Sequence, residues 1–93
     1  MSDKEAFYSK LKERLDNTTT FPTEYLYKFI VPTTGNQVKE TEELFKNTLA
    51  KITTNTSKTG RYISVSIRVQ LTSADKVISY YKKAEKIEGI ISL

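Results

Sequence analysis

The residues best suited to chemistry cluster in the second half of the chain. Three cations, Lys58, Arg61 and Arg68, share one stretch with two serines, Ser64 and Ser66. Cations and hydroxyls of this kind can hold an anionic group. They have little means of activating a nucleophile, because the chain has no histidine and no cysteine, and no lysine base is placed beside the serines. The sequence therefore predicts binding rather than nucleophilic catalysis here.

The rest of the chain predicts no enzyme, metal or cofactor site. Its acidic cluster, Glu40, Glu42 and Glu43, falls on one predicted helix, on the face expected to be solvated. The stretch from Lys58 to Gly60 is a turn, without the glycine spacing of a phosphate-binding loop. The commonest metal ligand, histidine, is absent. We predict no catalytic residue, no metal and no cofactor.

The positive charge is concentrated in the same region. The chain has 93 residues and a net charge of +4, yet all five charged residues between Leu44 and Ala74 are basic. This segment is either a solvated basic hairpin or a surface that faces an anion. The charged N-terminus has no signal-peptide core, and no apolar run is long enough to span a membrane. We expect a cytoplasmic protein with no membrane partner.

The first element that the sequence predicts is a helix over residues 3–16. Ser2 and Glu5 have the spacing of a capping box, with Ser2 as the N-cap. Phe7, Leu11 and Leu15 follow at intervals of four and form a narrow apolar stripe. Residues 17–20 are poor helix formers and read as a linker. We expect the stripe to pack on the body of the protein, because a lone helix of this length is marginally stable in water.

Residues 21–93 predict an alternation of strands and helices. We expect strands over residues 23–31, 49–57, 61–71 and 90–93, with the second at a sheet edge and a turn at 58–60. A helix follows Asn36 as far as about Asn47. A last helix follows Thr72 and Ser73, with Asp75 at the capping-box position of Thr72. We predict an N-terminal helix and linker over residues 1–20 and one domain over 21–93.

The predicted fold is α+β, a ferredoxin-like βαββαβ two-layer sandwich with an additional N-terminal helix. Right-handed crossovers place both helices of the sandwich on one face of the sheet. Odd residues from Ile63 to Leu71 are apolar and must face those helices. The other face is then open, with the first and third strands side by side at its centre. We place on it and on the adjoining turn the predicted ligand- or partner-binding residues: Lys28, Lys58, Gly60, Arg61, Tyr62, Ser64, Ser66 and Arg68.

Two short motifs resemble a known family of small bacterial domains, DUF493, the YbeD-like proteins. They are Phe21-Pro22-Thr23 with Tyr27-Lys28, and Gly60-Arg61-Tyr62-Ile63-Ser64-Val65-Ser66 after Ser57-Lys58. The likeness spans about residues 21–93. Thr59 is an extra residue in the turn, and the N-terminal helix is longer than the usual lead-in. The resemblance implies a fold similar to the ACT-type regulatory domains.

The preferred interpretation is a regulatory or interaction module. It would bind an unknown protein partner or a small anionic ligand through residues 57–70 and the open face. That face could be covered by the N-terminal helix, by a second copy in a homodimer, or by a partner. The alternative is an RNA-binding module of RRM-like topology, which stacks bases on outward aromatics of the first and third strands. Tyr25, Tyr27 and Phe29 have the parity of core residues, so we rank nucleic acid lower.

Overall fold

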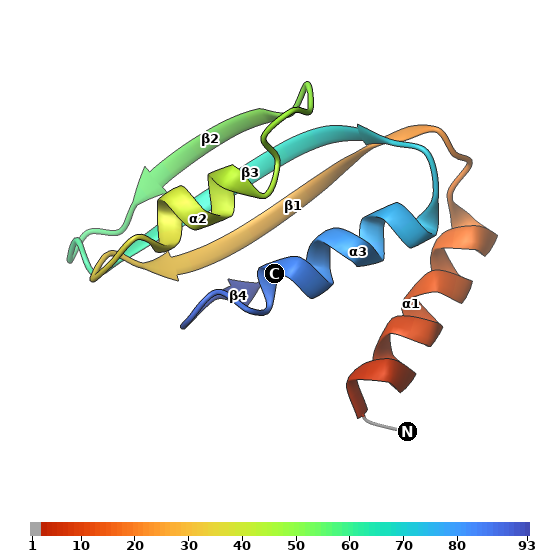
Figure 1. The fold of residues 1–93 in the computed structure, drawn as a ribbon, viewed down its shortest axis with the longest axis horizontal. Coiled ribbons are helices and arrows are strands. Elements are labelled where there is room, and N and C mark those ends of the chain that lie inside the picture. The colour runs from red at the N-terminus through yellow and green to blue at the C-terminus, as the bar shows by residue number, and fades with distance from the viewer. Residues whose placement is uncertain (1–2) are drawn as a thin grey trace.

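The computed structural model describes residues 3–93, which form three helices and one four-stranded sheet (Figure 1). The elements follow in the order α1 (Asp3–Thr18), β1 (Thr23–Pro32), α2 (Gln37–Glu43), β2 (Lys51–Thr56), β3 (Tyr62–Leu71), α3 (Ala74–Ala84) and β4 (Ile91–Ser92). After α1 this is the predicted β-α-β-β-α-β order. The ferredoxin-like α+β sandwich with an added N-terminal helix is therefore confirmed. The N-cap predicted at Ser2 lies outside the described residues.

The sheet is antiparallel, and its strand order is β2-β3-β1-β4. The two long strands β1 and β3 pair along their whole length at the centre, with Lys28 opposite Ser66. β2 pairs with the outer side of β3, and the short β4 pairs with β1. Helices α2 and α3 lie on the same side of the sheet (Figure 1). The other side carries no helix of residues 3–93.

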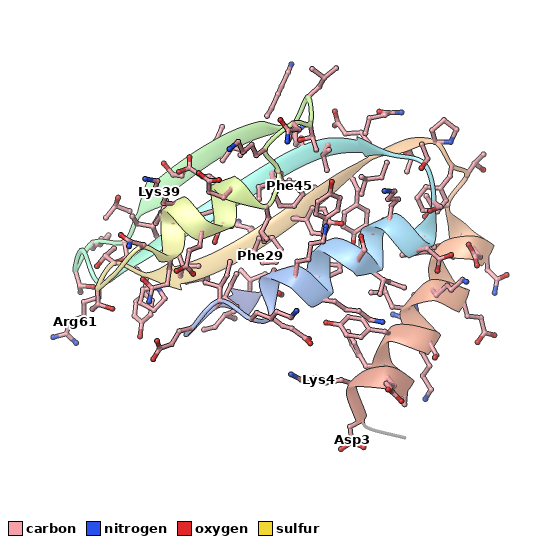
Figure 2. All side chains as sticks on the ribbon, in the orientation of Figure 1. Asp3, Lys4, Phe29, Lys39, Phe45 and Arg61 are labelled. Carbon is pink, nitrogen blue, oxygen red and sulfur yellow. The ribbon has the colours of Figure 1, made fainter. Side chains whose placement is uncertain are left out.

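The core lies between the sheet and these two helices, and it is rich in aromatic rings. Tyr27, Phe29 and Ile67 have no exposed surface, and Figure 2 shows Phe29 in the interior. The Tyr27 hydroxyl donates a hydrogen bond to the Val77 carbonyl of α3 at 2.8 Å. Burial raises the pKa of Tyr27, so this tyrosine stays protonated and keeps its donor. The predicted parity of β1 and β3 is therefore confirmed.

Helix α2 is shorter than predicted. Its apolar pattern continues to Phe45, but regular helix ends at Glu43. The next N–H groups bond three residues back, from Phe45 to Glu42 and from Lys46 to Glu43, which tightens the backbone. Asn47 then takes a left-handed conformation with φ of 68°. The chain therefore turns away and reaches the sheet edge only at Lys51.

The start of α3 also differs from the prediction. Ser73 is the N-cap, and its Oγ accepts a hydrogen bond from the Lys76 N–H at 3.2 Å. Thr72 lies one residue outside this cap, so the capping box predicted between Thr72 and Asp75 is wrong. Asp75 instead forms an ion pair with Lys12 of α1, with 3.1 Å between Oδ1 and Nζ.

The β2–β3 turn contains one residue more than the predicted turn. Ser57 donates its backbone N–H to the Tyr62 carbonyl at 2.8 Å, so residues 58–61 form the loop and β3 begins at Tyr62. Gly60 has a φ of +73°, a left-handed conformation that glycine adopts without steric cost. This loop length sets the register of the hairpin and places Lys51 opposite Arg68.

Candidate interaction surface

We call the side of the sheet away from α2 and α3 the open face. Because Tyr27 and Phe29 point inward, the residues between and beside them on β1 point outward. The register places Leu26 opposite Arg68, Lys28 opposite Ser66 and Ile30 opposite Ser64. Four of the predicted binding residues, Lys28, Ser64, Ser66 and Arg68, therefore lie together on one surface, and Tyr62 lies at its end.

Helix α1 leaves the open face uncovered, because it packs against α3 instead (Figure 1). Besides the ion pair between Lys12 and Asp75, the Tyr8 hydroxyl donates to Glu85 Oε2 at 2.7 Å. Burial, followed by the hydrogen bond and the charge of Glu85, raises the pKa of Tyr8 to about 12.

The predicted apolar stripe of α1 packs only in part. Leu15 is buried and Leu11 is half-buried, but Phe7 is 63% exposed. The expectation that Phe7 packs on the body is therefore wrong. The far end of α1 is held by polar contacts to α3 rather than by its stripe.

The half of the open face over β1 and β4 carries three apolar residues, with Lys28 between Leu26 and Ile30 on β1. Ile91 lies opposite Ile30 and is 50% exposed, and Leu26 is 51% exposed. Ile30 is half-buried. Ile30 and Ile91 are direct neighbours across β1 and β4, whereas Leu26 lies four residues along β1, about 13 Å away, on the other side of Lys28. The open face therefore offers a partner a pair of apolar neighbours and one separate exposed leucine.

The other half of the open face, over β3 and β2, is cationic. Lys51 lies directly opposite Arg68, and Lys28 is the diagonal neighbour of Arg68 on the other side. Residues opposite one another on an antiparallel pair have Cβ atoms about 5 Å apart, so two like charges face each other here. The nearby acid is Glu24, with its Oε1 at 3.8 Å from Arg68 Nη1. This distance is beyond hydrogen-bond range, and the guanidinium donors remain available to another anion.

Lys51 is a candidate site residue that the sequence prediction missed. The sequence places it on the predicted edge strand over residues 49–57 but does not assign it to the binding site. A four-residue loop pairs Ser57 with Tyr62, and counting back from that pair places Lys51 opposite Arg68. A three-residue turn would instead have placed Lys51 opposite Ile67, on the helix side.

The two serines differ in what they can offer a ligand. The Ser64 Oγ donates a hydrogen bond to the Asn55 carbonyl at 3.3 Å, so its proton is used within the hairpin. Ser66 is half-buried between Lys28 on β1 and Thr53 on β2. Within residues 3–93 there is no group of three acidic, histidine or cysteine residues that could hold a metal ion.

The structure does not bring the tip of the hairpin together with the rest of the predicted site. Arg61 is seven residues from Arg68 along β3, a distance of about 23 Å at the usual rise of a strand. Figure 2 shows Arg61 at the end of the molecule, pointing away from it.

Two backbone N–H groups of this turn are already bonded within it. The N–H of Gly60 donates to the Ser57 carbonyl, and the N–H of Arg61 to Thr59 Oγ1. These two N–H groups are therefore not available as donors to an anion. The open face and the tip are separate surfaces.

Comparison with known proteins agrees with this fold. No helix in the described part of the chain has the length and apolarity needed to cross a membrane. A solution structure of protein HP0495 from H. pylori is similar, with a TM-score of 0.65 and 20% sequence identity. The match covers 82% of this chain and 86% of that chain. No curated protein matches. A family model described as "Protein of unknown function (DUF493)" matches residues 16–93, and the chain therefore belongs to the DUF493 family.

Proposed function

We propose that this domain is an interaction module, without catalytic activity of its own, whose open face binds an acidic surface of a partner protein. The observation that supports this function is an uncovered sheet face that carries both apolar residues and cations. Leu26, Ile30 and Ile91 offer apolar area, and Lys28, Lys51 and Arg68 offer positive charge. The apolar residues supply binding energy, and the cations select a partner of opposite charge.

The dimensions of the open face suit a protein partner. β1 and β3 have ten residues each, β2 has six and β4 has two; at about 3.3 Å per residue and about 4.8 Å per strand they give about 440 Å² before side-chain relief is counted. A standard protein interface buries about 800 Å² on each partner, so this face supplies about half of one and its margins supply the rest. A small metabolite would use a concave site, whereas these cations stand exposed along strands.

The positions of the aromatic rings argue against the RNA-binding alternative. Tyr27 and Phe29 are fully buried, and Tyr25 is half-buried with its hydroxyl 2.9 Å from that of Tyr81. Their places on the open face are taken by Leu26, Lys28 and Ile30. Base stacking needs outward rings on both central strands. The described part of β1 offers none there, so we retain the protein partner.

A site-specific photo-crosslinker tests the proposal. We expect a crosslinker at Leu26 to yield one discrete adduct in cells, and one at Lys86, an exposed residue just after α3, to yield none. The charge reversal Arg68→Glu should suppress the Leu26 adduct. The partner identified in this way should then bind the purified domain, and its affinity should fall as salt is added. Equal labelling from both positions would refute the proposal, as would a Leu26 adduct whose yield is unchanged by Arg68→Glu.

A further inference from the structure

The outer edge of the sheet at β2 is built to accept another strand. β2 is the last strand of the sheet, and Figure 1 shows it at the margin of the molecule. Its six residues pair with β3 in unbroken register, without a bulge or a proline. All of them are exposed except Ile52, which is half-buried. Natural edges are usually blunted by such interruptions, whereas this one has Lys51 and Asn55 to discourage pairing and no break in its ladder.

The backbone groups of this edge can be assigned from the ladder. Ser57 and Tyr62 form a hydrogen-bonded pair, and such pairs alternate along an antiparallel ladder. The N–H and C=O groups of Ile52, Thr54 and Thr56 must therefore point away from β3. They offer three donors and three acceptors to a strand laid beside β2.

A hollow lies beside this edge on the helix side. It is bordered by the end of α2, the residues that follow it, and Ile52 of β2. Phe45 and Ile52 give it an apolar lining, and its charged residues are balanced, two lysines and two glutamates: Lys39, Lys46, Glu42 and Glu43. A strand added to β2 would direct every second side chain to this side. An apolar side chain on this side can pack against Phe45 and Ile52 in the hollow.

The opposite side of the same edge is cationic. Lys51 is the first residue of β2, and Arg68 lies across the ladder from it on the open face. The hairpin that contains them has no acidic residue between Leu44 and Ala74. The side chains that an added strand directs to the open face would therefore bind best if they were acidic.

We propose that an extended segment of a partner protein, with alternating acidic and apolar residues, adds to the free edge of β2 as a fifth strand. This inference rests on the proposed function and specifies the partner's chemistry. Main-chain bonds to Ile52, Thr54 and Thr56 supply affinity, and the two sides of the edge select the side chains.

Charge disfavours a second copy of this chain as the occupant. Pairing two β2 edges about a two-fold axis brings two hairpins together, each with Lys51 and Arg68 on the same face and with the single acid Glu24, on β1, beside Arg68. Like charges repel across a shared sheet surface. An acidic segment meets the same cations with opposite charge.

The test uses a synthetic peptide, acetyl-Glu-Val-Glu-Val-Glu-Val-amide, added to the ¹⁵N-labelled full chain at low salt. We expect chemical-shift changes and slower solvent exchange at the amides of Ile52, Thr54 and Thr56. The matched peptide with lysine in place of each glutamate should bind at least about threefold more weakly, because it turns each attraction into a repulsion.

Three variants localise the binding. Thr54→Pro removes the central outward N–H without removing a bond to β3, and it should weaken binding about tenfold. Lys51→Glu should weaken binding about threefold, and Lys86→Glu, the same charge change far from β2, should leave it unchanged. An ¹⁵N spectrum of each variant verifies that the fold is retained.

The possible results separate this inference from the proposed function. Shifts at Leu26 and Ile30 without any at Ile52, Thr54 and Thr56 would overturn strand addition and leave binding at the open face standing. Equal binding of both peptides would overturn the inference, as would an absence of any response. Concentration-dependent shifts at the β2 edge without peptide would assign that edge to a second copy and overturn it as well.

Discussion

Reversing the charge of Lys51 should stabilise the fold, because this residue faces Arg68 directly across β2 and β3. Lys51→Glu removes one cross-strand repulsion and adds one attraction, each worth about 0.2–1 kcal/mol. The Arg68 side chain is 62% exposed and has Glu24 at 3.8 Å, so solvent and this acid weaken both contributions. We expect a net gain of about 0.5–1 kcal/mol at low salt. For a domain of this size that corresponds to a rise in Tm of about 2–8 °C.

The measurement is urea unfolding of the natural chain, Lys51→Glu, Arg68→Gln and the double variant. Comparing the four isolates the interaction between the two positions. The gain should disappear in the Arg68→Gln background. It should also shrink in 1 M salt, where the Debye length is about 3 Å. A loss of stability in Lys51→Glu would show that the two charges do not interact as the register implies. So would a gain that is the same in the Arg68→Gln background and in 1 M salt.

Three further predictions concern the body of the domain. Burial raises the pKa of Tyr27 above its ordinary 10.0, so the unfolded chain loses the Tyr27 proton at a lower pH than the folded chain does. The free energy of unfolding should therefore fall as pH rises above about 10. Urea titrations at several pH values should show a smaller fall for Tyr27→Phe. Gly89→Ala should lower the free energy of unfolding by about 1–3 kcal/mol, because φ is +76° and the new Cβ would lie 2.7 Å from Pro32 Cγ. Gly60→Ala has a similar φ but open space around the new Cβ, so thermal melts should show a smaller loss. Deleting residues 1–20 should leave residues 21–93 folded, as judged by NMR, but should lower the free energy of unfolding by about 1–2 kcal/mol because the buried Leu15 is lost. An unfolded truncation would contradict the proposed division of the chain into residues 1–20 and 21–93.

The central strands could be predicted residue by residue, because their pattern is strict. Odd positions from Ile63 to Leu71 are apolar, and a one-residue error in parity would expose all of them. The end of α2 could not be predicted in this way. Phe45 continues the helical spacing, and its burial depends on the tight turn and left-handed Asn47 that follow. Periodicity records which side chains are buried, and a tightened turn can bury the same side chain as a helix.

The candidate surface depended on two features that sequence patterns specify poorly. One is the length of the β2–β3 turn, since a single extra residue moves Lys51 from the helix side to the open face. The other is the docking of α1. Its stripe predicted packing but not a direction, and the docked position combines the burial of Leu15 with polar contacts such as Tyr8 with Glu85. These residues are 77 positions apart, and no local pattern connects them.

Lys51 has two possible roles, and the sign of its charge separates them. Lysines on edge strands keep sheets from pairing with each other, and that protective role needs a charge but not a positive one. Recognition of an acidic segment needs a positive charge, and it would benefit from the second cation, Arg68, that lies opposite Lys51. Lys51→Glu should therefore keep the chain monomeric in size-exclusion chromatography while lowering its affinity for the acidic peptide. Lys51→Gln should lower that affinity less, and it should be the variant that self-associates. If Lys51→Glu bound the acidic peptide as well as the natural chain does, the role of Lys51 would be limited to preventing edge-to-edge pairing of sheets.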